Sequence, residues 1–513
     1  MTRSFLGPIS ISFRKEGVCG RDGDRVAGAR ARPRMMIGLR GRAALPIVMV
    51  AVLGVNLGDT LPPANASVVS SDWTSYMHGD SSGFNSSAGF STRHATITAA
   101  NASMLRKEWT ATSGGPVFAQ PIVANGSVYW GSFDGYERAT SSSGKLVWKT
   151  FLGTTTPPAG TCNPASAGVV STATYRTDVS IGASRAVVFV GGGDASLYAL
   201  DASSGAVLWR RSLGATPAHF IWDSPAYYKG SLYIGLSSYG DCPLTAGQVF
   251  RIDARTGKID STLNLMPHGC AGDGVWGSPA IDASRNVLYF VTGNSGMGCP
   301  SAVPWGESLV AVSLGDLHVV DHWAVPPSER LFDSDFGSTP NLFTATIKGK
   351  TRALIGVVNK DGLYYAFDRT AIGAGPVWSV RVATGGATPE TGAGTITPAA
   401  WDGQNRALYA GGPAATIGKH ACAGSISAVD PNTGRFQWRD CLTDGYVIGA
   451  VSGAPGFVIV GEGTHLLVVR TSDGHTLYNT TGNATFEGPA TISNGVIYAT
   501  DVAGNLTAFA TPP

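Results

Sequence analysis

The chain contains few charged residues and lacks the short sequences that mark several common kinds of catalytic site. Lys, Arg, Asp and Glu make up 14% of its 513 residues, and the net charge is +2. Because many of the basic residues lie before residue 45, the rest of the chain offers no basic stripe of the kind that binds nucleic acid. No HExxH or GxSxG arrangement supports a zinc or serine-hydrolase site, and the glycines lie in strand and turn contexts, which argues against a nucleotide-binding loop.

The sequence has no apolar run of the length that a membrane-spanning helix needs. The shorter run near the N-terminus is typical of a signal peptide. Residues 35–66 contain two basic residues, then roughly 13 apolar residues, then a small-x-small ending. A membrane anchor, which is the alternative, needs about 20 residues. We therefore predict a leader over residues 1–66 that ends at Ala66, with the true start at Met35 or Met36. The mature protein is then secreted or extracytoplasmic, with no stable membrane span.

Cysteine is also scarce, and its pattern fits an exported protein. Removal of the leader discards Cys19 and leaves six cysteines, an even number that suits an oxidising compartment. Six cysteines allow 15 pairings, so most of the connectivity stays open. Cys422 and Cys441 lie at the start and end of one repeat unit, where neighbouring strands can bring them together, and we predict this disulfide. No C-x-x-C or C-x-x-C-H spacing occurs, so neither a zinc ribbon nor a c-type haem site is indicated.

Glycine and short alternating strands are abundant instead, and they recur as a repeat. The chain has 68 Gly and 29 Pro, and no convincing amphipathic helix of twelve or more residues interrupts it. The clearest unit is VFVGGGDASLYALDASSGAVLW at 188–209. A Gly precedes a Trp by four residues in several units, as in Gly205 and Trp209. This spacing predicts a turn followed by an outer strand.

The number of repeat units predicts an all-β propeller. Seven units begin near residues 117, 168, 219, 274, 335, 392 and 447. A short final unit at 484–510 lacks the Trp-bearing strand, and MLRKEWTA at 104–111 can supply it. We therefore predict a single domain over residues 67–513, an eight-bladed β-propeller in which the N-terminal strand completes the C-terminal blade. Seven blades with one degenerate unit is the alternative.

The repeat resembles the pyrroloquinoline quinone (PQQ) repeat, and the chain from residue 70 onward is similar to secreted quinoprotein alcohol dehydrogenase-like propellers, including polyvinyl-alcohol-dehydrogenase-like proteins. The resemblance is most specific over residues 274–294, 333–343 and 357–370. The resemblance implies PQQ-dependent oxidation of a small or polymeric alcohol, with electrons passed to an external acceptor because no haem domain is present. The same repeat also builds non-catalytic propellers, so a binding or envelope-scaffold protein is the alternative function.

The resemblance also implies roles for individual residues. Trp276 corresponds to an aromatic wall of the cofactor site, and its structural alternative is core packing between blades. Asn294, in the TGN sequence, corresponds to a Ca²⁺ ligand, and its alternative is a turn cap. Lys360, in NKDG, corresponds to the cation that contacts the quinone oxygens, and its alternative is an exposed hairpin lysine.

The general base is assigned from its position along the chain. The family's catalytic Asp follows the TGN loop, and the nearest acid along the chain is Glu307, which we predict as base and metal ligand. Asp333 and Asp335 lie on one face if extended, and blade-to-blade hydrogen bonding is the interpretation we favour for them. The chain departs from the family in two ways. Cys162 has no adjacent Cys to form the family's vicinal disulfide, and residues 168–182 contain no match to the Glu that provides a further Ca²⁺ ligand.

Overall fold

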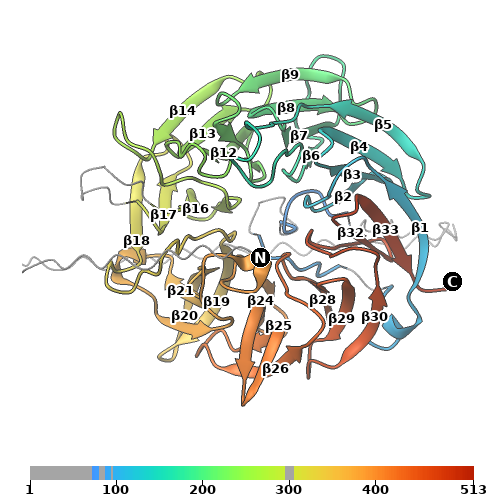
Figure 1. Ribbon diagram of the computed structural model, residues 1–513, viewed down its shortest axis with the longest axis vertical. Coiled ribbons are helices and arrows are strands. Elements are labelled where there is room, and N and C mark those ends of the chain that lie inside the picture. The colour runs from blue at the N-terminus through green and yellow to red at the C-terminus, as the bar shows by residue number, and fades with distance from the viewer. Residues whose placement is uncertain (1–71, 80–86, 94–95, 295–304, 513) are drawn as a thin grey trace, which may run out of the picture. The chain divides into compact units, whose positions relative to one another are not determined.

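The described part of the chain forms eight antiparallel sheets arranged around a central axis in the computed structural model (Figure 1). These sheets are the blades of a β-propeller, and they confirm the predicted all-β fold with eight blades. All of the described residues belong to the unit Ser67–Pro513, whereas the predicted leader lies outside them. The structure describes residues 72–79, 87–93, 96–294 and 305–512.

The first four blades follow one another along the chain, and each has four strands in sequence order, to which blade 3 adds a fifth, short strand. Blade 1 contains β2 (Ile122–Ala124), β3 (Ser127–Gly131), β4 (Tyr136–Ser141) and β5 (Leu146–Phe151). Blade 2 contains β6 (Thr174–Arg176), β7 (Val187–Gly191), β8 (Ser196–Asp201) and β9 (Val207–Ser212). Blade 3 contains β11 (Ala226–Tyr228), β12 (Ser231–Ser238), β13 (Gln248–Asp253), β14 (Ile259–Asn264) and the additional strand β10 (His219–Phe220). Blade 4 contains β15 (Ala280–Asp282), β16 (Val287–Val291), β17 (Ser308–Ser313) and β18 (Val319–Ala324).

Blades 5 to 7 repeat this order, and blade 8 takes its outer strand from the other end of the described chain. Blade 5 contains β19 (Asn341–Ile347), β20 (Lys350–Val358), β21 (Leu363–Asp368) and β22 (Trp378–Arg381). Blade 6 contains β23 (Ala400–Asp402), β24 (Ala407–Ile417), β25 (His420–Val429) and β26 (Phe436–Leu442). Blade 7 contains β27 (Ser452–Ala454), β28 (Phe457–Glu462), β29 (His465–Arg470) and β30 (Thr476–Thr481). Blade 8 contains β31 (Thr491–Ser493), β32 (Val496–Thr500), β33 (Asn505–Ala510) and β1 (Arg106–Thr112).

Short 3₁₀ turns are the helical elements within the described ranges: η1 (Ala102–Met104), η2 (Ile372–Ala374) and η3 (Pro389–Thr391). No helix in those ranges has the length and apolar character that a membrane crossing requires.

The ring closes through the pairing of β1 with β33. Trp109 stands opposite Ala508 in this antiparallel ladder, and Figure 1 shows β1 on the outer rim beside β33. A strand from the N-terminal side of the chain thus covers the edge of the last sheet, which would otherwise present unpaired backbone groups. The predicted closure is confirmed, and the seven-blade alternative is wrong.

The Gly and Trp of the repeat meet across neighbouring blades. Trp148 in β5 of blade 1 donates from Nε1 to the carbonyl oxygen of Ala202 in blade 2, at 3.0 Å. Its ring packs on Gly205, whose φ is +72° and where an added Cβ would lie 2.6 Å from the indole. The same contact joins Trp109 to Gly144 and Trp438 to Gly474. Blades 1, 2 and 6 therefore each carry a tryptophan that packs on a glycine of the next blade and a glycine that receives the tryptophan of the previous blade.

The hydrophobic core lies between the blades. Tyr289 and Leu309 of blade 4, for example, pack in one buried cluster with Ile355 and Phe367 of blade 5. Because each sheet buries its faces against its two neighbours, a single blade has no core of its own.

Two disulfides lie within the described residues. Cys422 and Cys441 pair within blade 6, which confirms the predicted bridge. Cys162 and Cys242 join the loop between β5 and β6 to the loop between β12 and β13.

Candidate functional site

The predicted site residues lie in loops at one end of the propeller axis. Trp276 precedes β15, Asn294 follows β16, and Glu307 precedes β17 in blade 4. Asp335 precedes β19 and Lys360 follows β20 in blade 5. Because the strands of each blade are antiparallel, the first and third strands begin at the same edge where the second one ends. The sequence therefore places all five residues at one mouth of the axis.

Lys360 and two aspartates form the charged part of the site. Lys360 Nζ lies 3.1 Å from Asp333 Oδ2 and 3.2 Å from Asp335 Oδ2. The backbone N–H of Asn294 donates to Asp335 Oδ1 at 2.7 Å. Lys360 is buried, as is Asp335, so it is not the exposed hairpin lysine that was the alternative. Asp335 does form hydrogen bonds between blades 4 and 5, as we favoured, and these bonds connect it to both Lys360 and Asn294.

Burial and the neighbouring charges shift the pKa values of Asp335 and Lys360 in opposite directions. Burial raises the pKa of Asp335, and the Lys360 ammonium only partly offsets this effect. Burial alone would lower the pKa of Lys360, but the carboxylates of Asp335 and Asp333 more than offset it, and the pKa is raised. Lys360 therefore keeps a fixed positive charge, while Asp335 accepts a proton more readily than an ordinary aspartate does.

Trp276 lies beside this cluster. Lys360 Nζ lies 5.4 Å from the centre of the Trp276 ring. The ring lies so close to Gly337 that a Cβ there would fall 1.9 Å from it, and Gly293 separates its Nε1 from the Asp335 carboxylate. Both glycines leave room for a flat indole next to the charged groups. Trp276 is also exposed to an open cavity on the axis, so it is not only a packing residue.

Glu307 lies in the same region but has a different partner. Its Oε2 lies 2.7 Å from Arg330 Nε, and its backbone N–H donates to the carbonyl of Gly293. Burial raises the pKa of Glu307 to about 7, although Arg330 lowers it, and the charges of Asp335 and Asp333 raise it further. The structure therefore brings Glu307 near the aspartates while Arg330 pairs with its carboxylate.

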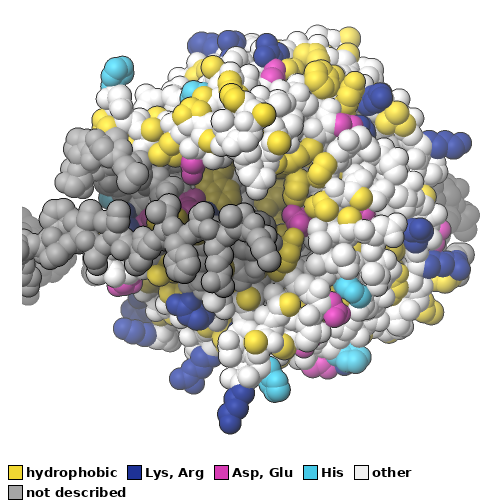
Figure 2. Space-filling model, in the orientation of Figure 1, with side chains coloured by type: hydrophobic (Ala, Val, Ile, Leu, Met, Phe, Trp, Pro, Cys, Tyr) yellow, Lys and Arg dark blue, Asp and Glu magenta, His cyan; other side chains and the backbone are white. Residues whose placement is uncertain are grey.

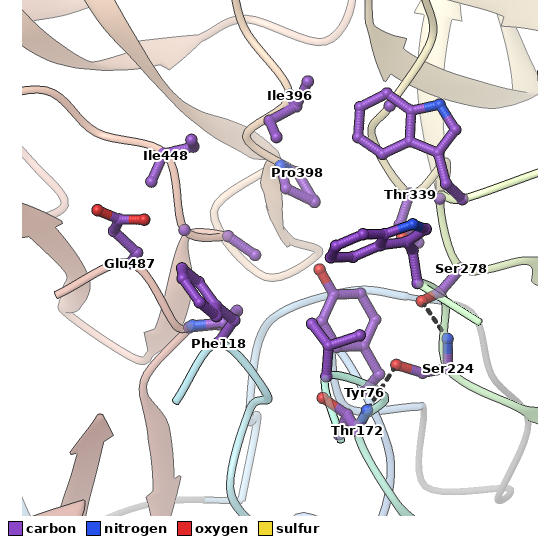
Figure 3. Close-up of a pocket in the computed structure, with 18 residues that line it drawn as sticks. Tyr76, Phe118, Thr172, Ser224, Ser278, Thr339, Ile396, Pro398, Ile448 and Glu487 are labelled. Atoms are coloured by element: carbon purple, nitrogen blue, oxygen red, sulfur yellow. Dashed lines mark hydrogen bonds between the residues drawn. The ribbon is translucent and has the colours of Figure 1, made fainter. Parts of the chain in front are cut away.

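A cavity of about 170 Å³ lies on the axis next to Trp276 (Figure 3). Its lining comes from the segments that precede the first strands of all eight blades, and this places the cavity on the axis. The lining includes Phe118, Thr172, Ser224, Trp276, Thr339, Ile396, Ile448 and Glu487, one from each blade in turn. Figure 2 shows the propeller hollowed near its middle, with hydrophobic side chains inside the hollow.

Three hydroxyl groups follow one another along one side of this cavity. The backbone N–H of Gln120 donates to Thr172 Oγ1 at 2.8 Å. The backbone N–H of Thr172 donates to Ser224 Oγ at 3.0 Å and that of Ser224 to Ser278 Oγ at 2.9 Å, as Figure 3 shows. Each hydroxyl oxygen accepts from the preceding blade, which leaves its own hydrogen to donate. The lining thus offers O–H donors, whereas none of its described residues is Lys or Arg.

The arrangement fits PQQ, a flat quinone with three carboxylates. Trp276 provides a planar apolar wall, the hydroxyls of Thr172, Ser224 and Ser278 provide donors for carboxylate oxygens, and Lys360 provides a buried cation at the edge of that wall. These three kinds of group come from four different blades. The residues present therefore suit the cofactor that the sequence resemblance implies.

The described residues offer few free oxygen ligands for Ca²⁺. Ca²⁺ takes about six to eight oxygen ligands. Within residues 72–79, 87–93, 96–294 and 305–512, no group of three or more His, Cys, Asp or Glu side chains is arranged to hold a metal ion. Glu307 is paired with Arg330, and both oxygens of Asp335 already have donors. These residues do not make a calcium site by themselves, and the calcium roles of Asn294 and Glu307 remain predictions.

Sequence reasoning missed two contributors to the site. Tyr76 lines the cavity from a segment that precedes the first blade strand, and no repeat pattern pointed to it. Arg330 pairs with Glu307 from the loop between β18 and β19. The short stretch DSDFG, with two acids around Ser334, was the one available signal for Asp335.

Two family models match the chain. The model described as "Outer membrane protein assembly factor BamB" matches residues 70–218, 181–315 and 423–511, which is more than half of the chain. The model described as "Glucose/ethanol/alcohol dehydrogenase, beta-propeller domain" matches residues 249–395. The second range contains every predicted site residue.

Curated relatives include polyvinylalcohol dehydrogenases and a quinohemoprotein alcohol dehydrogenase. The enzyme from Pseudomonas sp is 23% identical over 432 residues, which cover 74% of this chain and 64% of the relative. The enzyme from Sphingopyxis sp. (strain 113P3) is 27% identical, over 47% of this chain and 42% of the relative. Quinohemoprotein alcohol dehydrogenase of Comamonas testosteroni is 26% identical, over 53% and 42%. The chain thus spans between 42% and 64% of the length of these relatives.

Solved structures share the fold. The crystal structure of quinohemoprotein alcohol dehydrogenase from Comamonas testosteroni has a TM-score of 0.67 at 17% identity and covers 87% of this chain and 81% of that one. A europium-containing methanol dehydrogenase has a TM-score of 0.69 at 15% identity and covers 86% and 98%. From the matched family models, the blade count and these structures, the chain belongs to the PQQ-repeat β-propeller family.

Proposed function

We propose that this propeller binds PQQ at the mouth of its axis and oxidises an alcohol, with the electrons passed to an external acceptor. The observation that carries the proposal is the convergence of Lys360, Asp335 and Trp276, three residues from two blades, beside a cavity lined by hydroxyl donors. A purely structural loop would not need a buried cation shared by two carboxylates next to an open indole face. The match of residues 249–395 to an alcohol dehydrogenase propeller model supports the same conclusion.

The chain's own residues would bind and orient the cofactor. Trp276 would lie against its flat face, and Thr172, Ser224 and Ser278 would donate to its carboxylates. Lys360 would place a positive charge beside its carbonyl oxygens, since this lysine keeps its proton. PQQ, when bound, supplies the quinone that accepts two electrons from the alcohol.

We assign the general base to Asp335 in preference to Glu307. Asp335 lies next to Lys360 and Trp276, and in its deprotonated form it can accept the hydroxyl proton of an alcohol. Its raised pKa makes it a stronger proton acceptor than an ordinary aspartate. Each acid has a cationic partner, Arg330 for Glu307 and Lys360 for Asp335, and we prefer Asp335 because its partner also lies beside the Trp276 ring. Glu307 then orients the loop that carries Arg330.

The substrate class and the setting follow from the relatives' names and from the leader. The relatives named polyvinylalcohol dehydrogenase and quinohemoprotein alcohol dehydrogenase suggest a small or polymeric alcohol. The leader predicted over residues 1–66 suggests an extracytoplasmic location, where a separate acceptor would receive the electrons. A non-catalytic scaffold is the second candidate, because the family model that covers most of the chain is described by an outer membrane assembly factor.

Calorimetric titration with PQQ separates these candidates. The mature chain, residues 67–513, is titrated with PQQ in the presence of Ca²⁺ and again with a chelator, together with Lys360→Ala and the control Lys350→Ala. Lys350 lies at the exposed end of β20, whereas Lys360 follows its buried end, so the control removes the same charge from the same blade. Binding that Lys360→Ala weakens at least tenfold and Lys350→Ala leaves unchanged supports the quinoprotein.

The other outcomes are equally informative. A folded wild-type protein that binds no PQQ under either condition contradicts the proposal and favours the scaffold. Binding that persists with the chelator leaves the quinoprotein assignment in place and removes calcium from it. Binding that requires Ca²⁺ supports the predicted calcium ligands, Asn294 and Glu307.

A further inference from the structure

A segment before the first blade strand runs along the propeller axis. Trp73 pairs with Val123 in β2, donating at 2.9 Å and accepting at 2.8 Å. The carbonyl of Thr74 accepts from the backbone N–H of Tyr175 in β6, at 2.9 Å. Trp73 is fully buried. Residues 72–79 are therefore fixed to blades 1 and 2 by backbone hydrogen bonds and by a buried anchor.

The same segment is fixed at its other end by a buried glutamine. The backbone N–H of Met77 donates to Gln120 Oε1 at 2.8 Å, and Gln120 Nε2 donates to the carbonyl of Ala490 in blade 8, also at 2.8 Å. The carbonyl of Met77 accepts from Gly89, and Gly89 in turn accepts from Gly453 in blade 7. Met77 and Gln120 are both fully buried. The described residues on both sides of position 76 thus tie the segment to blades 1, 2, 7 and 8.

Tyr76 lies between these anchors and faces the cavity. It is one of the residues that line the cavity together with Trp276 and Thr339 (Figure 3). Figure 3 shows its ring standing among the lining residues, with Thr172 and Ser224 nearby and its hydroxyl directed toward the middle. Burial raises the pKa of Tyr76, and a hydrogen bond with Thr339 opposes this only weakly, so the phenol keeps its proton.

The hydroxyl of Tyr76 lies in the cavity, where it can contact a ligand. A phenylalanine would fill the same space on the axis, but it would offer no hydroxyl to Thr339 or to a ligand. A tyrosine instead adds an O–H donor to a cavity that already presents the hydroxyls of Thr172, Ser224 and Ser278. Four donors on one side suit a ligand rich in acceptor oxygens.

We propose that Tyr76 is a ligand-contacting residue, and that the segment 72–79 completes the binding cavity by delivering the Tyr76 hydroxyl as a donor to an oxygen of a planar quinone or carboxylate ligand. The identity of that ligand as PQQ rests on the proposed function. The segment is then a part of the site.

The test measures PQQ affinity by quenching of tryptophan fluorescence in the full mature chain. Tyr76→Phe removes one oxygen and keeps the ring, so the fold is preserved. We expect its dissociation constant to rise about tenfold, as for the loss of one hydrogen bond to a carboxylate. Tyr478→Phe on the outer strand β30, away from the cavity lining, is the matched control and should leave the constant unchanged. Thermal unfolding of each variant verifies that both remain folded.

A second readout does not use PQQ. Tyr76→Ala removes a phenol-sized group, and p-cresol should raise the melting temperature of this variant and not that of the wild type. Wild-type affinity in Tyr76→Phe, together with no effect of p-cresol on Tyr76→Ala, overturns the inference. If the wild type binds no PQQ, the proposed function fails, and the p-cresol result alone then decides whether Tyr76 borders a cavity that ligands reach.

Discussion

The ammonium group of Lys360 lies 3.2 Å from the carboxylate of Asp335, although 25 positions separate the two residues in the sequence. Asp335 belongs to the segment that enters β19, and Lys360 follows β20. The antiparallel pairing of β19 with β20 returns the chain to the same end of the blade, which is why the two groups meet. This pair, next to Trp276, is the centre of the proposed site.

Asp335→Asn should abolish alcohol oxidation while sparing cofactor affinity. The amide keeps the shape and cannot accept the alcohol's proton, so we expect kcat to fall about 10²- to 10⁴-fold. Glu307→Gln should retain most of the activity, because Arg330 already occupies that carboxylate. Steady-state rates with an artificial acceptor and PQQ dissociation constants measure the two effects. The reverse ranking of the two variants would move the base to Glu307.

The pH profile distinguishes the same two acids. A base must be deprotonated, so kcat/KM should fall as the pH drops through its pKa. Burial raises the pKa of both acids, that of Asp335 to about 6 and that of Glu307 to about 7, so the comparison of variants, and not the midpoint alone, separates them. With Asp335 as base, Glu307→Gln keeps the acid limb of the profile. Loss of a limb with a midpoint near 7 in that variant would identify Glu307 instead.

Glu137→Gln should stabilise the protein at alkaline pH. Glu137 is fully buried between blades 1 and 2, and neither carboxyl oxygen has a hydrogen-bond partner among the described residues. Burial raises the pKa of Glu137 well above 4.5. Between pH 4.5 and that raised value the folded state holds a proton that the unfolded chain releases, so stability falls as the pH rises.

At pH 8 the glutamine variant should therefore be more stable than the wild type by at least about 1 kcal/mol, and near pH 4 the two should differ little. Denaturant titrations at both pH values measure this difference. Glu108→Gln on the exposed surface of β1 is the control and should not change the pH dependence. Equal stability of wild type and Glu137→Gln at pH 8 would mean that the carboxylate finds a partner.

Gly205→Ala should destabilise the contact between blades 1 and 2. A Cβ at Gly205 would lie 2.6 Å from the Trp148 indole, at a φ of +72°. Gly126 has a similar φ of +77° but nothing within 4 Å of the added Cβ, so Gly126→Ala carries the backbone strain alone. Both variants should lose about 1 kcal/mol or more from strain, and Gly205→Ala should lose a further 1 to 3 kcal/mol from overpacking. Equal losses in chemical denaturation would show that the indole moves aside freely.

The repeat pattern in the sequence determined the architecture. The short strands, the turn glycines and the Trp spacing predicted eight all-β blades, and the missing strand of the last unit predicted that residues 104–111 close the ring. The structure confirms both, with β1 at Arg106–Thr112. Local patterns sufficed here because each unit repeats one supersecondary structure and can bury its faces only against copies of itself.

The residues that the sequence singled out, Trp276, Asn294, Glu307 and Lys360, occupy loops at one mouth of the axis, and their roles stay predictions. The sequence could not rank the acids, because nearness along the chain favoured Glu307, whereas in space Lys360 pairs with Asp333 and Asp335. It could not find Tyr76, which lies outside the repeat. Contacts across the axis and between blades depend on how the eight sheets close into a ring. The sequence of a single unit does not determine the distances between residues of different blades. Tertiary structure alone therefore decided which charges meet and which side chains face the cavity.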